Sequence, residues 1–161
     1  MITDGLKKKF DVLLGYYPAD QRQAAVIPLL HLMQDSASGN YLTAEAQQLV
    51  ADYIGMPVSK VHEVVSFYTM LSERPRGKNH MLVCHTLPCD LTGCASVVSA
   101  IADKLHIHDG EVSKDGKFSM EEAECLARCG EGPVMQIGET VYTHLTAEKT
   151  AAIIDELARK S

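Results

Sequence analysis

The sequence has no tryptophan, only 6% aromatic residues, and no long apolar run. Every apolar stretch is well short of the roughly 20 residues that a membrane-spanning helix needs, so we expect no direct membrane insertion. The first ten residues also lack the apolar core and the cleavage site of a signal peptide. These absences favour a protein that works in the cytoplasm, which is a reducing compartment.

An excess of basic residues is missing as well, because the formal net charge is -6. Two helix-like segments around Gly55-Met56-Pro57 are reminiscent of a DNA-binding motif, but residues 41–71 contain one lysine and three acidic residues. Nucleic-acid binding requires basic side chains that meet phosphates, so we expect none here. Phosphate-binding glycine motifs are absent too, which predicts no site for NAD, flavin or nucleotide in this chain alone.

Four of the five cysteines form two spaced pairs. Cys84 and Cys89 have four residues between them, Cys125 and Cys129 have three, and 35 residues separate the two pairs. In a reducing compartment, clustered cysteines are more often metal ligands or redox groups than structural disulfides. A [2Fe-2S] cluster needs four thiolates, so the spacing predicts one cluster bound by Cys84, Cys89, Cys125 and Cys129.

Zinc is the rival metal, because structural Cys₄ zinc sites use pairs with two to four intervening residues. Both spacings in this chain fall within that range, so a zinc-stapled interaction module with no redox role stays open. A catalytic dithiol of the thioredoxin type would need two cysteines separated by two residues, and the chain has no such pair.

Other residues near the cysteines have weaker assignments. Cys94 is in helical register with Val97 and Ile101, so we interpret it as a packing residue, with a role as spare ligand only if Cys89 were lost. His85 and His144 are the histidines expected near the cluster. Arg128 lies between two predicted ligands and is either a charge that tunes the cluster or a surface residue.

The chain divides by pattern into three parts. Residues 1–71 show helical spacing of apolar residues and predict a small helical bundle in which Thr43 and Ser59 cap two helices. Residues 72–80 are a predicted linker. Residues 81–161 predict an α/β module: a strand into Cys84, a helix from about 92 to 105, strands near 117–123, 133–137 and 140–143, and a last helix capped by Thr146.

Four segments of the sequence carry a resemblance to a known family. They are the first cysteine motif CHTLPCDLTG at 84–93, the turn DGKF at 115–118, the second motif ECLARCGEGPVM at 124–135, and VVSFY at 64–68. The chain resembles the E subunit of NADH-quinone oxidoreductase, which is the small [2Fe-2S] subunit of respiratory complex I. This resemblance covers nearly the whole chain.

The resemblance implies an α+β protein: an N-terminal helical bundle followed by a thioredoxin-like α/β [2Fe-2S] ferredoxin domain. Cys84, Cys89, Cys125 and Cys129 inherit the ligand role, and Cys94 does not. The implied function is that of an electron-transfer subunit of NADH:quinone oxidoreductase, an enzyme of the respiratory chain. Its cluster accepts single electrons from the FMN of a partner flavoprotein, which also holds NADH and a [4Fe-4S] cluster.

The implied location is a peripheral arm of a larger respiratory complex on the cytoplasmic face of the inner membrane. Related subunits occur in NAD-reducing hydrogenases, in electron-bifurcating hydrogenases and in NAD-dependent formate dehydrogenases. These assemblies remain the alternatives to complex I.

Overall fold

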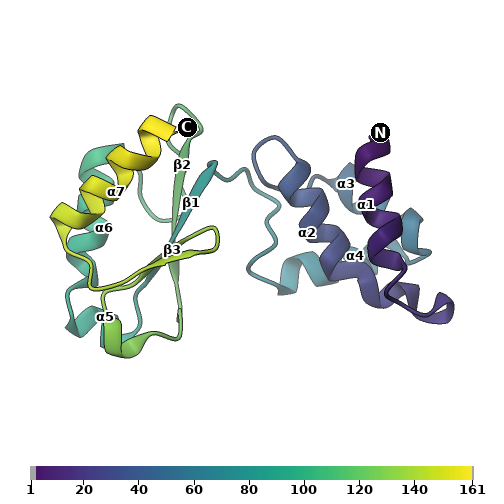
Figure 1. Ribbon diagram of the computed structural model, residues 1–161, viewed down its shortest axis with the longest axis horizontal. Coiled ribbons are helices and arrows are strands. Elements are labelled where there is room, and N and C mark those ends of the chain that lie inside the picture. The colour runs from purple at the N-terminus through teal and green to yellow at the C-terminus, as the bar shows by residue number, and fades with distance from the viewer. Residues whose placement is uncertain (1–2, 161) are drawn as a thin grey trace. The chain divides into compact units, whose positions relative to one another are not determined.

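The computed structural model describes residues 3–160, which form two compact units divided between Pro75 and Arg76 (Figure 1). Each unit has its own hydrophobic core. The first unit is helical and the second contains the sheet. Among the described residues, no helix is long and apolar enough to cross a membrane.

The first unit is built from amphipathic helices that bury one face each, as the apolar spacing predicts. Its elements are α1 (Asp4–Leu14), η1 (Ala19–Ala25), α2 (Val26–Ser36), α3 (Ala44–Ile54) and α4 (Val58–Phe67). Phe10 of α1 and Leu29 of α2 are fully buried at the centre of this core.

Of the two helix caps predicted in the first unit, the structure contains one and lacks the other. The Thr43 hydroxyl accepts a hydrogen bond from the Ala46 amide at 3.2 Å, so Thr43 caps α3 as expected. Ser59 does not cap α4, because that helix already begins at Val58 behind Pro57. Proline at this position fixes a backbone angle suited to a helix start and displaces the cap that Ser59 was expected to form.

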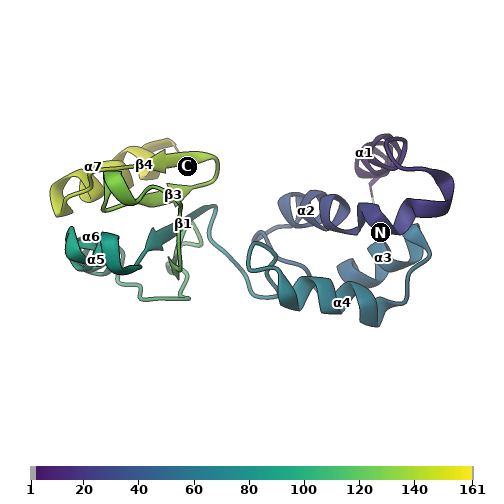
Figure 2. The same cartoon turned by 90° about the horizontal axis from the view of Figure 1, so that it is seen from below.

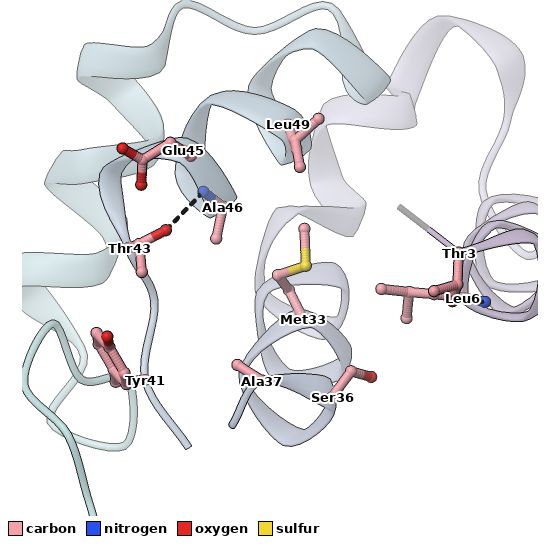
Figure 3. Close-up of a pocket in the computed structure, with 10 residues that line it drawn as sticks. All are labelled: Thr3, Leu6, Met33, Ser36, Ala37, Tyr41, Thr43, Glu45, Ala46 and Leu49. Carbon is pink, nitrogen blue, oxygen red and sulfur yellow. Dashed lines mark hydrogen bonds between the residues drawn. The ribbon is translucent and has the colours of Figure 1, made fainter. Parts of the chain in front are cut away.

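A cavity of about 310 Å³ lies in the helical unit. Figure 3 shows its lining from α1, α2 and α3, with Leu6, Met33 and Leu49 among the apolar side chains. No cysteine or histidine lines this cavity, so its lining offers none of the sulfur or imidazole ligands on which the predicted metal site depends.

The second unit contains a mixed four-stranded sheet in the order β2-β1-β3-β4. The strands are β1 (Asn79–Cys84), β2 (Phe118–Ala123), β3 (Met135–Ile137) and β4 (Thr140–Tyr142). The strand β1 is parallel to β2 and antiparallel to β3, and β3 forms the expected hairpin with β4. Because β1 begins at Asn79, the last two residues of the predicted linker belong to the sheet.

Helices cover one side of this sheet. The helices α6 (Cys94–Leu105) and α7 (Ala147–Lys160) lie against each other on the same side of the strands (Figures 1 and 2). Thr146 caps α7 as predicted, through a hydrogen bond from the Lys149 amide at 3.2 Å. Met81 and Val83 point from β1 into this core and are fully buried, which is the period-two alternation of a half-buried strand.

Candidate metal centre

Cys84 ends the central strand β1, at the edge of the sheet where two other segments converge. Its amide donates to the Val134 carbonyl at 3.0 Å, and the next amide, that of His85, donates to the Ala123 carbonyl at 3.2 Å. Ala123 is the last residue of β2, and Val134 immediately precedes β3. The 124–133 loop, which carries Cys125 and Cys129, therefore starts on one side of Cys84 and returns on the other.

Cys89 lies on a short helix that the sequence did not predict as such, α5 (Leu87–Leu91). Figure 1 shows α5 and the 124–133 loop at the same end of the sheet. The loop comes close to the segment of α5 at Gly132. An added Cβ at Gly132 would be 2.5 Å from the Thr92 hydroxyl oxygen and 3.6 Å from the Cys89 Cα. A glycine at this position lets the loop pack directly against the helix that carries Cys89.

The buried thiols of the first pair are hydrogen-bonded to each other and to backbone amides of the neighbouring segments. Burial raises the pKa of the Cys84 thiol, but hydrogen bonds from the Thr86 hydroxyl and amide, the Cys89 thiol and the Leu126 amide outweigh burial and lower the pKa overall. The Leu126 amide belongs to the loop of the second pair, so this contact joins the two motifs.

Cys89 shows the opposite shift. Burial, together with the hydrogen bond and the charge of the adjacent Cys84 sulfur, raises the pKa of the Cys89 thiol to about 11. The Val134 amide offsets part of this rise by donating to the Cys89 sulfur. Of the two thiols, that of Cys84 is therefore the more acidic.

The second pair is arranged differently, because Cys125 and Cys129 are both exposed. The Ala127 amide donates to the Cys125 sulfur at 3.3 Å. Ala127 itself has a positive φ of 56°, a conformation that turns the loop sharply between the two cysteines. Cys129 begins the short 3₁₀ helix η2 (Cys129–Glu131), which packs against α5.

The structure thus brings Cys84 and Cys89 together and sets the loop of Cys125 and Cys129 beside them. Within residues 3–160, no three His, Cys, Asp or Glu side chains are already arranged to hold a metal ion. The donor chemistry nevertheless fits a thiolate-bound cluster, because amides from both motifs point at the sulfurs of Cys84 and Cys89. Such amides stabilise negative charge on sulfur.

Cys94 is buried on the α6 face, as its helical register predicts. It is also packed in one cluster with Cys84 and Cys89, which helical periodicity could not reveal. Burial and the nearby negative charges of Asp90, Cys84 and Glu122 raise the pKa of its thiol. Three of the five thiols therefore share one buried region.

The other singled-out residues lie around this region. His85 follows Cys84 and lies 3.9 Å from carboxylate oxygens of both Glu122 and Glu124. The His144 amide donates to the Glu131 carbonyl of η2 at 2.8 Å. Arg128 pairs with the Glu131 carboxylate at 2.8 Å, so its positive charge is balanced within the loop.

Sequence reasoning missed the polar groups that contact the first-pair sulfurs. Thr86, whose hydroxyl oxygen is 3.3 Å from the Cys84 sulfur, lies between the first two cysteines and could have been noticed from its position. The amides of Leu126 and Val134 have no sequence signal, because every non-proline residue carries an amide and only the fold aims it.

Comparisons with known proteins identify relatives of this chain. The sequence profile of the thioredoxin-like [2Fe-2S] ferredoxin family matches residues 10–158. The NADH-quinone oxidoreductase E subunit of Rickettsia bellii (strain RML369-C) is 45% identical over 145 residues, which cover 90% of this chain and 86% of the relative. Its counterpart in Rickettsia prowazekii (strain Madrid E) is 36% identical over 146 residues, covering 91% of this chain and 82% of the relative.

A eukaryotic relative matches over a similar length. NADH dehydrogenase [ubiquinone] flavoprotein 2, mitochondrial, of Dictyostelium discoideum is 36% identical over 149 residues, covering 92% of this chain and 60% of the relative.

A solved structure shares the fold. A chain of the NAD+-reducing [NiFe]-hydrogenase in the H2-reduced state superposes with a TM-score of 0.73 at 15% identity, covering 85% of this chain. This chain spans only 22% of that hydrogenase chain, so the likeness concerns the fold. The predicted fold class is confirmed: helices come first and the mixed sheet follows. Together, the matching profile and the rickettsial relatives show that the chain belongs to the thioredoxin-like [2Fe-2S] ferredoxin family, as a homologue of the E subunit of NADH-quinone oxidoreductase.

Proposed function

We propose that this chain is an electron-transfer subunit of an NADH:quinone oxidoreductase, with one [2Fe-2S] cluster held by Cys84, Cys89, Cys125 and Cys129. One arrangement carries the proposal: the Cys84 amide donates to the Val134 carbonyl at 3.0 Å, so the loop of the second pair returns to the sheet beside the first pair. This arrangement supports a single site for the two motifs, which are far apart in the sequence.

When bound, the cluster supplies a one-electron acceptor, whereas NADH gives up two electrons together as hydride. The chain's own residues hold and orient this acceptor. Cys84 and Cys89 provide buried sulfurs, and the amides of Thr86, Leu126 and Val134 stabilise negative charge on them. The exposed Cys125 and Cys129 leave the outer side of the site open to a redox partner.

The proposed partner is a flavoprotein that binds FMN, NADH and a [4Fe-4S] cluster and converts the hydride into single electrons. We further propose that the helical unit contributes to the contact with this partner, in a peripheral arm on the cytoplasmic face of the inner membrane. Phe67 is 78% exposed and Met70 is 51% exposed. Their neighbour Tyr68 instead packs against the core of the helical unit.

A second assignment is the equivalent subunit of an NAD-reducing hydrogenase. The observation that favours it is the TM-score of 0.73 to a chain of such an enzyme. The 45% identity to a rickettsial subunit of NADH-quinone oxidoreductase weighs more, so complex I is the preferred assembly.

The test is the metal content and spectrum of the purified full chain after anaerobic reconstitution with iron and sulfide. We expect two irons and two sulfides per chain, a coloured oxidised protein, and an electron paramagnetic resonance signal on reduction. A colourless protein that contains zinc and no sulfide would overturn the proposal in favour of a zinc-stapled interaction module.

A further inference from the structure

Thr86 occupies the N-cap position of α5, but its side chain does not cap that helix. Its backbone has the extended geometry of an N-cap, with φ -67° and ψ 160°, and no amide of α5 donates to its hydroxyl. The hydroxyl oxygen lies instead 3.3 Å from the Cys84 sulfur. The Thr86 side chain therefore does not have the helix-capping role that threonine usually has at an N-cap position.

Three other threonines of the chain show the usual role. Thr3, Thr43 and Thr146 each precede a helix, and each hydroxyl accepts a hydrogen bond from an amide three residues later, at 3.4, 3.2 and 3.2 Å respectively. The contrast indicates that the environment of Cys84, and not a property of threonine, sets the orientation of Thr86.

The direction of the Thr86–Cys84 hydrogen bond follows from the chemistry of a ligand cysteine. A metal-bound cysteine is a thiolate, which has no proton and can only accept. The Thr86 hydroxyl must then be the donor. The same sulfur also receives the amides of Thr86 and Leu126, so the hydroxyl completes a set of donors around one ligand.

A bound cluster would gain one negative charge on reduction, and part of that charge would reside on the sulfurs of its ligands. A hydrogen bond to sulfur is therefore stronger in the reduced state than in the oxidised state. We propose that Thr86 is a positioning residue for the Cys84 sulfur, and that its hydroxyl raises the reduction potential of the site. This inference rests on the proposed function, because it assumes a cluster bound to Cys84.

Neighbouring polar side chains are already used elsewhere. The Thr92 hydroxyl donates to the carbonyl groups of Pro88 and Cys89, both at 3.0 Å. The Arg128 guanidinium is paired with Glu131. Of the hydroxyl and guanidinium groups around the first pair, the Thr86 hydroxyl is the one whose distance to a predicted ligand sulfur is that of a hydrogen bond.

The experiment compares Thr86→Val, which removes the hydroxyl and keeps the shape, with Thr86→Ser, which keeps the hydroxyl. Thr146→Val is the matched control, because it removes a true helix-capping hydroxyl in the same unit. Each full-length variant is reconstituted, its iron per chain is measured, and its midpoint potential is determined by redox titration. Thr86→Val should shift the reduction equilibrium about tenfold toward the oxidised form, or about 59 mV for a one-electron couple.

Thr86→Ser and Thr146→Val should both keep the wild-type midpoint. Pulsed electron paramagnetic resonance of the reduced proteins in H₂O and D₂O adds a direct signature. The coupling to the exchangeable hydroxyl proton should be present in the wild type and in Thr86→Ser, and absent in Thr86→Val. If Thr86→Val does not retain iron, the smaller Thr86→Ala replaces it in the same comparison.

An unchanged midpoint in an iron-replete Thr86→Val variant overturns the inference. So does a Thr86→Ser variant that shifts as far as Thr86→Val, because the hydroxyl would then not be the cause. Either result leaves the proposed function intact. Failure of the wild-type chain to assemble iron and sulfide would instead overturn the proposed function itself.

Discussion

Cysteine environment differs sharply between the two pairs, since the first is buried and the second is exposed. We predict that Cys84→Ser, Cys89→Ser, Cys125→Ser and Cys129→Ser each lose most of the iron. A serine hydroxyl is a harder and much less acidic ligand than a thiol. Cys94→Ser should keep full iron. The measurement is iron per chain after identical reconstitution of all five variants.

The position of Cys94 adds a sharper comparison to this series. Because its thiol is packed with those of Cys84 and Cys89, it is placed to replace one of them. The double variant Cys89→Ser/Cys94→Ser is therefore measured beside Cys89→Ser. Iron that survives in the single variant and disappears in the double would identify Cys94 as a substitute ligand. Full iron in Cys125→Ser would contradict the ligand assignment.

His80 gives the second unit a pH-dependent stability. Burial, and then the positive charge of Arg76, lower the pKa of His80 from 6.5 to about 4. The unfolded chain binds this proton below pH 6.5, whereas the folded chain stays neutral down to about pH 4. The contribution of His80 to the free energy of unfolding is therefore fully present above pH 6.5. It falls by about 2–3 kcal/mol as the pH drops from 6.5 to 4.

Denaturant unfolding of the full chain without metal, at pH 7.5 and pH 4.5, tests this prediction. The loss of unfolding free energy on acidification should be smaller in His80→Gln than in the wild type, because glutamine does not titrate. Carboxylates that do not contact His80 contribute equally to both proteins and cancel in the comparison. Equal losses in the two proteins would contradict a role for His80.

At the scale of elements, the contact between β2 and the chain before β1 depends on a glycine. An added Cβ at Gly77 would lie 2.3 Å from the Phe118 carbonyl carbon and 2.6 Å from the Ser119 nitrogen. Both atoms are backbone, so the overlap can be relieved only by moving the backbone of β2 or of the segment that contains Gly77. The Gly77 amide also donates to the Ser119 hydroxyl at 2.9 Å, which fixes this approach.

We therefore predict that Gly77→Ala lowers the free energy of unfolding of the second unit by about 3 kcal/mol. Gly130→Ala is the matched control, because a Cβ there meets no atom within 4 Å. That control should change stability by less than about 1 kcal/mol. Thermal unfolding of the metal-free chains measures both, and a Gly77→Ala variant as stable as Gly130→Ala would refute the close approach.

Local sequence signals predicted most elements because these elements depend on periodicity and caps. The helices α1, α2 and α3, the β3–β4 hairpin and the Thr146 cap all follow from nearby residues. The end of α4 did not, because Tyr68 and Leu71 continue the apolar register while the helix stops at Phe67. Both residues are still part of the core or packed against it, as the register implied.

The site was predicted from cysteine spacing, which is a local property of the sequence. The burial and the contacts of each cysteine depend on the fold, which brings distant segments together. Spacing could not show that Cys84 and Cys89 are buried or that Cys125 and Cys129 are exposed. Burial is decided by how the 124–133 loop crosses the end of β1. The contact of Cys94 with the first pair is likewise a result of packing between α5, α6 and β1.

At the scale of the whole molecule, the two units differ in chemistry, because all five cysteines lie in the second. If the helical unit serves partner contact, an exposed apolar residue there should matter more for binding than for folding. We predict that Phe67→Asp weakens binding to the flavoprotein at least tenfold and leaves iron content unchanged. A charge placed in a desolvated contact is costly.

Val12→Asp is the matched control, because Val12 is another exposed apolar residue of the helical unit, at 62% exposure on α1. Binding is measured by titrating the cluster-loaded full chain with the flavoprotein. Equal affinity of Phe67→Asp and wild type would remove Phe67 from the contact. Equal weakening by both variants would argue against a contact centred on Phe67.

The division of chemistry between subunits leads to the last prediction, that the cluster-loaded chain alone does not oxidise NADH. It has no recognisable dinucleotide fingerprint, and a one-electron acceptor cannot take a hydride directly. NADH and an artificial electron acceptor are mixed with this chain, with the flavoprotein, and with both. The chain alone should give no turnover. In the mixture of chain and flavoprotein, NADH should reduce the cluster of this chain, and electron paramagnetic resonance should detect the reduced cluster. The four-serine variant, in which Cys84, Cys89, Cys125 and Cys129 are all replaced, should bind the flavoprotein without giving that signal. Turnover by the single chain would show that hydride chemistry resides in this subunit, and the accessory role would have to be abandoned.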